Sequence, residues 1–149
     1  MSDVSEKLEG FGGWLLLIAI GQWLGLFGTV GDLLLDLPDY LSGLGDPATR
    51  RVVVGQAAIE IFLLLFMFYT TLMMAMKRHE FPTLFRLQLA LAAVVPLASA
   101  VWLSHATGKP LEGVDFAGTA AQSVIAVIGA SISILYSLRS QRVRNTFIY

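Results

Sequence analysis

Residues 52–76 form an apolar run of 25 residues that contains one charged side chain, Glu60. As an α-helix the run would be roughly 37 Å long, enough to cross the roughly 30 Å hydrocarbon core of a bilayer. Three similar runs occur at residues 11–35, 84–102 and 116–138. Four such runs in one chain predict an all-α integral membrane protein, an antiparallel four-helix bundle with short loops.

Composition supports the membrane class. Charged residues make up 14 % of the chain, whereas soluble domains carry about 25 %, and the mean hydropathy is +0.71. We therefore expect residues 1–149 to form a single transmembrane domain that ends in a short basic and apolar tail at 139–149. The first run is longer than the roughly 7–15 apolar residues of a signal peptide, so we expect it to remain as a span. The apolar runs predict the lipid bilayer as partner, and the net charge of −1 predicts that no nucleic acid is bound.

The distribution of Lys and Arg predicts the orientation in the membrane, because cytoplasmic loops are enriched in these residues. Seven of them lie on one side, six in the termini and the middle loop and one, Arg86, at the entrance of the third span; the other two loops hold three, namely Arg50, Arg51 and Lys109. Both termini are therefore expected in the cytoplasm.

Glu60 should need a partner inside the membrane. A charged carboxylate at a helix centre costs about 2.5–3.5 kcal/mol, and protonating it at pH 7 costs roughly 3.7 kcal/mol from a pKa near 4.3. Gln56 lies one turn away on the same helix face. Counting helical rise places Thr29 and Gln122 about 9 Å below the outer boundary, close to the depth of Glu60, with Asp32 above them. We expect a polar cluster with these members: Glu60, Gln56, Gln122, Thr29 and Asp32.

Three interpretations of this cluster remain open. It can hold the helices together through hydrogen bonds, which are worth about 0.6 kcal/mol on average in membrane proteins. It can relay protons or ions or bind a small solute. Glu60 can also face the helix of a partner protein.

Glycines at helical spacing predict close packing between spans. Gly21, Gly25 and Gly28 share one face of the first span, and Gly118 and Gly129 belong to a stripe of small residues on the last. Small residues let membrane helices approach closely.

No catalytic constellation is visible. The chain has no cysteine and two histidines, and His79 and His105 are expected on opposite sides of the membrane. We therefore predict a protein that is not an enzyme and that holds no cofactor and no metal. The basic residues of the tail are predicted to contact lipid headgroups and fix the topology: Arg139, Arg142 and Arg144.

Several local features carry further predictions. Residues 36–46 are predicted to be a turn-rich loop, and Asp46-Pro47 is typical of a helix start. Pro96 should kink the third span. The apolar end of the tail is expected to fold back, so that Phe147 docks on the cytoplasmic face of the bundle.

Three short motifs resemble an uncharacterised family of small bacterial four-span inner-membrane proteins, the domain of unknown function with family number 2569. They are the Gly-Gly-Trp-Leu run at 12–15, Phe81-Pro82 after a basic loop, and the Arg-Val-Arg-Asn-Thr-Phe tail at 142–147. Arg144 stands where the family is expected to have Lys, which leaves the charge intact. The resemblance implies four spans and an inner-membrane location, and it implies no activity.

Two functions follow as hypotheses. The first is a non-enzymatic accessory or structural subunit that contacts another membrane protein. The second is a channel or small transporter, formed by a homo-oligomer, that uses Glu60 and the neighbouring amides.

Overall fold

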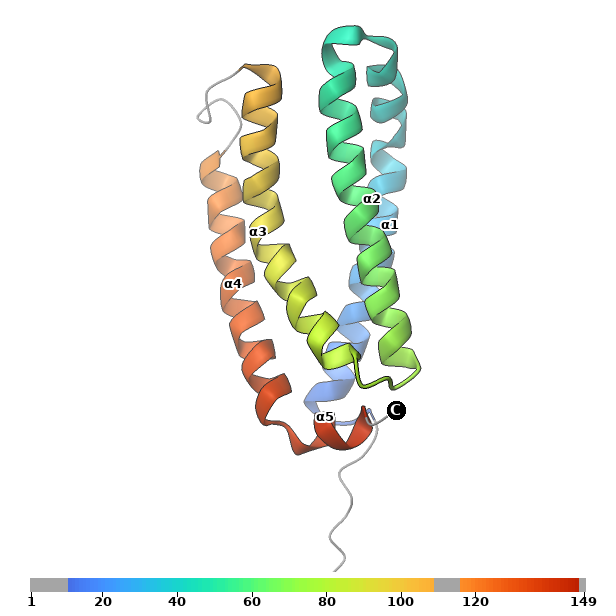
Figure 1. The fold of residues 1–149 in the computed structure, drawn as a ribbon, viewed down its shortest axis with the longest axis vertical. Coiled ribbons are helices and arrows are strands. Elements are labelled where there is room, and N and C mark those ends of the chain that lie inside the picture. The colour runs from blue at the N-terminus through green and yellow to red at the C-terminus, as the bar shows by residue number, and fades with distance from the viewer. Residues whose placement is uncertain (1–10, 109–115, 148–149) are drawn as a thin grey trace, which may run out of the picture.

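The computed structural model is all-α, as predicted. It describes residues 11–108 and 116–147, except the side chains at positions 48, 116, 117, 122 and 142. Four long helices run in alternating directions and a short fifth helix follows them (Figure 1). They are α1 (Trp14–Gly45), α2 (Pro47–Ala75), α3 (Phe81–Thr107), α4 (Phe116–Arg139) and α5 (Gln141–Thr146).

The long helices expose apolar surface over most of their length. At most 18 % of the most apolar window of each helix is buried, and none of the α2 window is. Leu65 on α2 is 62 % exposed and Ile125 on α4 is 70 % exposed. An apolar surface of this extent is not left in water, and all four helices are long enough to span a bilayer. The exposed apolar faces are therefore the faces that meet lipid.

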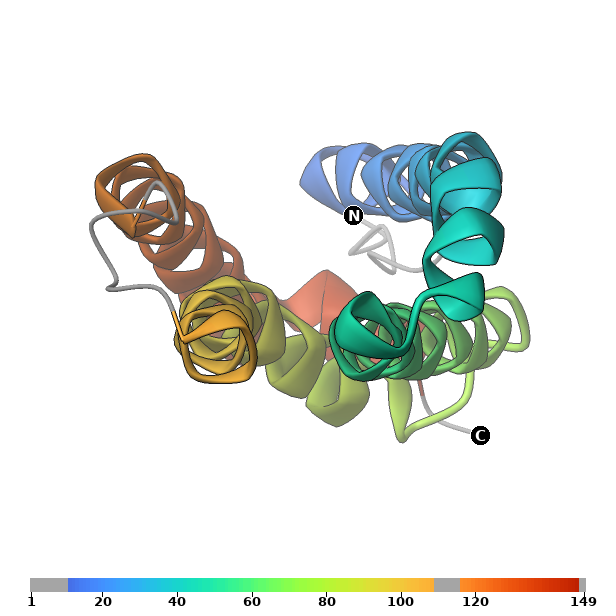
Figure 2. The ribbon, with the colours of Figure 1, turned by 90° about the horizontal axis from the view of Figure 1, so that it is seen from above.

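The four helices form an open arc. Packing follows the order of the chain, with α1 on α2, α2 on α3 and α3 on α4. Viewed from above, α1 and α4 stand at the two ends of the arc (Figure 2). The predicted antiparallel bundle is present, and it is open between its first and last helices.

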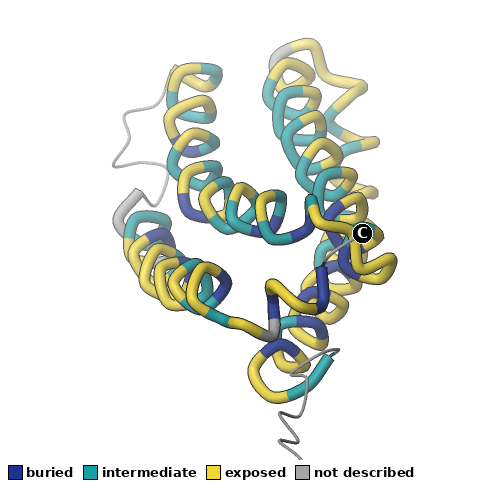
Figure 3. The backbone as a smooth tube through the Cα atoms, turned by 60° about the horizontal axis from the view of Figure 1, so that its bottom comes forward, coloured by how far each residue is buried: buried dark blue, intermediate teal, exposed yellow. Residues whose placement is uncertain are grey.

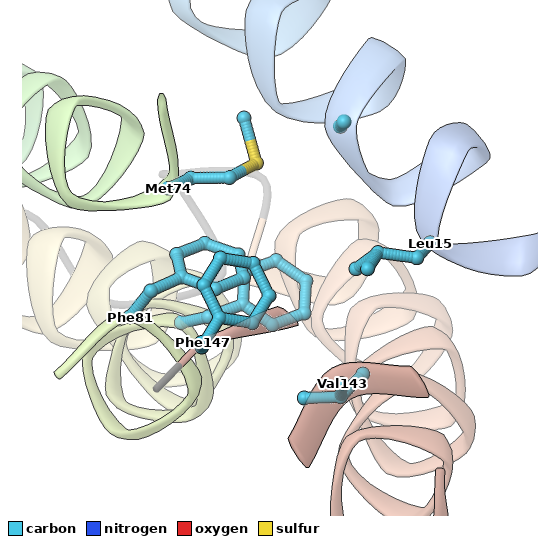
Figure 4. Packing of buried hydrophobic residues seen from close by; sticks show 7 residues of the cluster. Leu15, Met74, Phe81, Val143 and Phe147 are labelled. Carbon is cyan, nitrogen blue, oxygen red and sulfur yellow. The ribbon is translucent and has the colours of Figure 1, made fainter. Parts of the chain in front are cut away.

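Most of the buried core lies at one end of the molecule, where α1 begins, α2 turns into α3 and α5 crosses the bundle (Figure 3). Phe147 is buried there, with its ring centroid 4.6 Å from that of Phe81 and 6.1 Å from that of Phe11. Leu15 of α1, Met74 of α2 and Val143 of α5 belong to the same cluster (Figure 4). The predicted docking of Phe147 on the bundle is thus confirmed.

Helix α1 is longer than expected. Residues 36–45, predicted as a loop, are helical and include Pro38. The last turns of α1 bend toward the start of α2 (Figure 2), as expected for a helix that contains proline. Thr49 and Arg50 of α2 donate hydrogen bonds to the carbonyls of Gly43 and Leu44, at 2.9 and 3.0 Å. These bonds satisfy carbonyls that a helix C-terminus leaves free. The extra turns of α1 are therefore stabilised by side chains of α2, which lie outside the segment predicted to be a loop.

Helix α3 contains Pro96 and changes direction near its middle (Figure 1), as predicted. It ends at Gly108, whose φ of 67° places it in the left-handed region. Glycine adopts this conformation without steric cost, which makes it a common terminator of helices.

Candidate functional site

Glu60 has a hydrogen-bond partner at each carboxylate oxygen. The Gln56 amide donates to Oε1 at 2.8 Å from the same helix. The Tyr40 hydroxyl donates to Oε2 from α1. Glu60 therefore joins α1 to α2 while it lies half-buried inside an apolar helix.

The Tyr40–Glu60 bond depends on helix geometry that extends the reach of both side chains. Side chains in a helix tilt toward its N-terminus. Because α1 and α2 are antiparallel, Tyr40 points away from the turn that joins them and Glu60 points toward it. Tyr40 was missed as a partner because it was placed in a loop. If α1 had been predicted to continue past Pro38, Tyr40 would have been placed on a helix beside α2 and considered as a partner of Glu60.

Neither Thr29 nor Asp32 is hydrogen-bonded to Glu60 in the described structure. Thr29 donates to the Gly25 carbonyl at 3.0 Å and contacts the Met67 sulfur at 3.9 Å. Asp32 is exposed on α1, and the side chain of Gln122 lies outside the described residues. The expectation that Thr29 joins Glu60 is therefore wrong. Helical rise gives the depth of a residue but not the side of the helix on which it lies.

A second polar cluster joins α1, α2 and α3. The amides of Gln22 and Gln88 exchange hydrogen bonds of 2.8 and 3.1 Å, and Gln22 also donates to the Thr71 hydroxyl at 3.1 Å. Gln22 is 5 % exposed and Thr71 is 1 % exposed. Gln88 was not among the residues predicted to form a site. Helical rise along the observed helices places Gln22 about 12 Å from the start of α1 and Gln88 about 10 Å from the start of α3, but a similar depth does not show that the two helices turn these side chains toward each other.

A cavity of about 620 Å³ adjoins this second cluster and is lined by all four long helices. Phe85 and Gln22 lie deep in it and are 6 % and 5 % exposed. Trp14 of α1 and Ile132 of α4 also line it and are 69 % and 65 % exposed. Because these two residues belong to α1 and α4, the helices at the two ends of the arc (Figure 2), we place the opening of the cavity between α1 and α4. Its volume lies within the range of about 300–1,000 Å³ that is typical of ligand sites.

Four of the glycines that were predicted to pack against other helices make no close contact with another helix in the described part of this chain. Nothing lies within 4 Å of the position that a Cβ would take at Gly21, Gly28 or Gly129, and at Gly25 the Met67 side chain lies 3.9 Å away. The prediction of close packing is wrong for the first three within this chain, because no described side chain or neighbouring helix lies against them. Gly21 and Gly25 instead line the cavity. Gly118 is half-buried in the first turn of α4.

Close approaches occur at two glycines that the spacing did not indicate. A Cβ at Gly55 of α2 would lie 2.5 Å from the indole nitrogen of Trp102 on α3, and a Cβ at Gly43 would lie 2.5 Å from Val53. Both glycines therefore allow neighbouring helices to pack, and only the partner side chain identifies them.

The remaining predicted residues lie at the ends of the bundle. Arg139 ends α4 and Arg144 is exposed in α5, while the side chain of Arg142 lies outside the described residues. His79 precedes α3 and His105 lies in its last turn. Within residues 11–108 and 116–147, no three His, Cys, Asp or Glu side chains gather as metal ligands.

Comparison with known proteins gives one match. No curated protein and no solved structure matches the chain. The family model described as protein of unknown function (DUF2569) matches residues 8–148, nearly the whole chain. The family model and the four membrane-length helices agree with the short motifs at both ends of the chain. The protein therefore belongs to the DUF2569 family of proteins of unknown function.

Proposed function

We propose that this protein is a non-enzymatic accessory protein of a bacterial inner membrane that acts by contact with another membrane protein. The proposal rests mainly on the pairing of Glu60, whose two carboxylate oxygens accept hydrogen bonds from Tyr40 and Gln56. A carboxylate held by neutral donors from two helices fixes those helices relative to each other. In this role Glu60 is structural.

The second polar cluster supports the same role. Gln22, Gln88 and Thr71 use their polar groups to join three helices. Hydrogen bonds of this kind contribute about 0.6 kcal/mol on average, and up to about 1.7 kcal/mol, to membrane helix association. A scaffold held in this way keeps its apolar outer faces in fixed positions, as contact with a partner protein requires.

The competing function is a channel or small transporter. It would use Glu60 and nearby amides to carry a proton, an ion or a small solute, and Glu60 would have to exchange its partners during each cycle. Four helices leave little room for a pore, so this function would need a homo-oligomer.

Native mass spectrometry of the complex, extracted gently from the membrane of its own host, separates the two functions. The accessory role predicts a foreign membrane subunit at fixed stoichiometry. It also predicts that Glu60→Gln leaves the complex intact, because the substitution keeps the size of the side chain and the Tyr40 hydroxyl can rotate to accept a hydrogen bond from the new amide. A homo-oligomer alone, with proteoliposome flux that Glu60→Gln abolishes, would overturn the proposal in favour of the channel.

A further inference from the structure

We propose that the cavity between α1 and α4 binds a neutral membrane lipid whose polar group carries carbonyl oxygens. An isoprenoid quinone and a diacylglycerol share this chemistry. The inference does not depend on the accessory role, and a lipid site is compatible with either of the functions considered above.

The charge of the cavity selects a neutral ligand. Among the residues that the structure describes, its lining consists of apolar side chains, glycines and a few neutral polar groups, with no acid and no base. Transfer of an unpaired charge into such surroundings is strongly unfavourable. A phosphate or ammonium headgroup is therefore excluded from the deep part of the cavity.

The hydrogen bonds in the cavity wall select an acceptor. Both amide hydrogens of Gln22 are used, one by Thr71 and one by Gln88. Gln88 uses one of its amide hydrogens for Gln22, and a primary amide carries two. Gln88 lines the cavity, so its second amide hydrogen can be donated to a carbonyl oxygen of a ligand bound there. The hydroxyls of Ser133 and Tyr136 also line the cavity.

The depth of the amide pair argues for a lipid that can leave the membrane surface. Gln22 lies about 12 Å along α1 from its first residue, well inside the hydrocarbon region if α1 begins at the boundary. A phospholipid is held at the surface by its charged headgroup. A neutral polar group can move below the surface at much lower cost, and its hydrocarbon chain can leave through the opening between α1 and α4.

The same donor argues against a helix as occupant. The backbone polar groups of a membrane helix are already paired within the helix. A helix in the opening would therefore leave the Gln88 hydrogen without an acceptor, unless a polar side chain supplied one. A carbonyl-bearing lipid satisfies it directly.

Lipid titration of the purified full-length protein, followed by native mass spectrometry, tests the proposal. The probes are decyl-benzoquinone, dioleoylglycerol and, as the charged comparison, dioleoylphosphatidylglycerol. We expect one neutral lipid per chain, bound at least about tenfold more tightly than the anionic one, a difference of about 1.4 kcal/mol. Binding of the quinone alone, or of the diacylglycerol alone, identifies the source of the carbonyl groups.

Matched glycine variants locate the site. Gly21 and Gly28 lie on the same helix, and both have open space at the Cβ position, but only Gly21 lines the cavity. Gly21→Leu should fill the cavity and reduce neutral-lipid binding about tenfold or more, and Gly28→Leu should bind as the wild type does. If Gly21→Leu fails to fold, Ser133→Leu in the cavity and Ser131→Leu on the exposed face of α4 form the equivalent pair.

Gln88→Met, made together with Gln22→Met so that no freed Gln22 hydrogen replaces the lost donor, tests the donor while it keeps the volume of both side chains. We expect about tenfold weaker binding of the carbonyl-bearing probes, the effect of one lost hydrogen bond. Preferential binding of the anionic lipid, equal binding by Gly21→Leu and Gly28→Leu, or unchanged affinity in this double variant would each contradict the proposal.

Discussion

Tyr40 and Glu60, which lie on adjacent antiparallel helices, form a hydrogen bond from the tyrosine hydroxyl to the carboxylate. The bond connects the bent end of α1, beyond Pro38, to the apolar middle of α2. It supplies one of the two partners that keep Glu60 inside the membrane.

Tyr40→Phe should destabilise the protein by about 1–2 kcal/mol, because it removes this donor and leaves a carboxylate oxygen without a partner inside the bundle. Unfolding by SDS in mixed micelles measures the change. Tyr69→Phe removes a hydroxyl from a tyrosine that is 47 % exposed on α2 and serves as the control. Equal effects of the two substitutions would show that the Tyr40–Glu60 bond contributes nothing specific.

The Gln22–Gln88 pair should show energetic coupling. Either Gln22→Leu or Gln88→Leu leaves one buried amide without its reciprocal partner and should cost about 1–3 kcal/mol. The double variant should cost less than the sum of the single variants, with a coupling energy of about 1 kcal/mol. A double-mutant cycle in mixed micelles measures this coupling, and strict additivity would argue that the two amides act independently.

Gly55→Ala should weaken the contact between α2 and α3. The new methyl group would lie 2.5–2.8 Å from atoms of the Trp102 ring, and overpacking of this kind costs about 1–3 kcal/mol. Gly31→Ala, where nothing lies within 4 Å, should be neutral or slightly stabilising because alanine favours the helix.

Combining Gly55→Ala with Trp102→Leu should restore part of the lost stability, since the smaller side chain leaves room for the methyl group. Thermal unfolding in detergent compares the wild type, Gly55→Ala, Trp102→Leu and the double variant. Absence of rescue would place the defect elsewhere than at the Trp102 ring.

Phe147→Ala should release α5 from the end of the bundle. Phe147 is 5 % exposed and packs on Phe81 and Phe11, so its truncation should cost about 3–5 kcal/mol locally. Amide hydrogen exchange at residues 141–147 should accelerate strongly. Asn145→Ala, at an exposed position in the same helix, should leave the exchange rates close to those of the wild type.

A reporter that works only in the cytoplasm should be active when it is fused to the C-terminus. A reporter that works only outside the cytoplasm should be inactive at the same position. This expectation follows from the excess of Lys and Arg in the termini and the middle loop. Both reporters should show the opposite behaviour when they are placed in the loop between α1 and α2. If the C-terminal fusion were active outside the cytoplasm, every helix would have the orientation opposite to the predicted one.

The sequence predicted the main elements because each depends on local composition. Long uncharged runs predicted four helices, Pro47 marked the start of α2 and Pro96 the bend of α3. The limit of α1 was missed because its last turns depend on bonds from Thr49 and Arg50 of the next helix. No signal within residues 36–45 reports those bonds.

The candidate sites were only partly predictable. Glu60 and Gln56 lie four residues apart on one helix, and their contact follows from helical geometry alone. Tyr40 depends on the length and bend of α1, and the Gln22–Gln88 pair depends on how α1 and α3 face each other. The glycines that seat neighbours are those opposite a large side chain such as Trp102, and their spacing does not reveal which they are.

The sequence by itself determined that this chain is a four-span membrane protein, because the length and apolarity of each run are properties of the run alone. Only the tertiary structure decided which polar groups meet and where the cavity lies. Both depend on the rotation of each helix about its axis and on the opening between α1 and α4. Interactions between helices set this rotation and this opening, and the local sequence does not determine either of them. Outside the few polar pairs, most faces of an apolar helix pack against lipid and against neighbouring helices almost equally well.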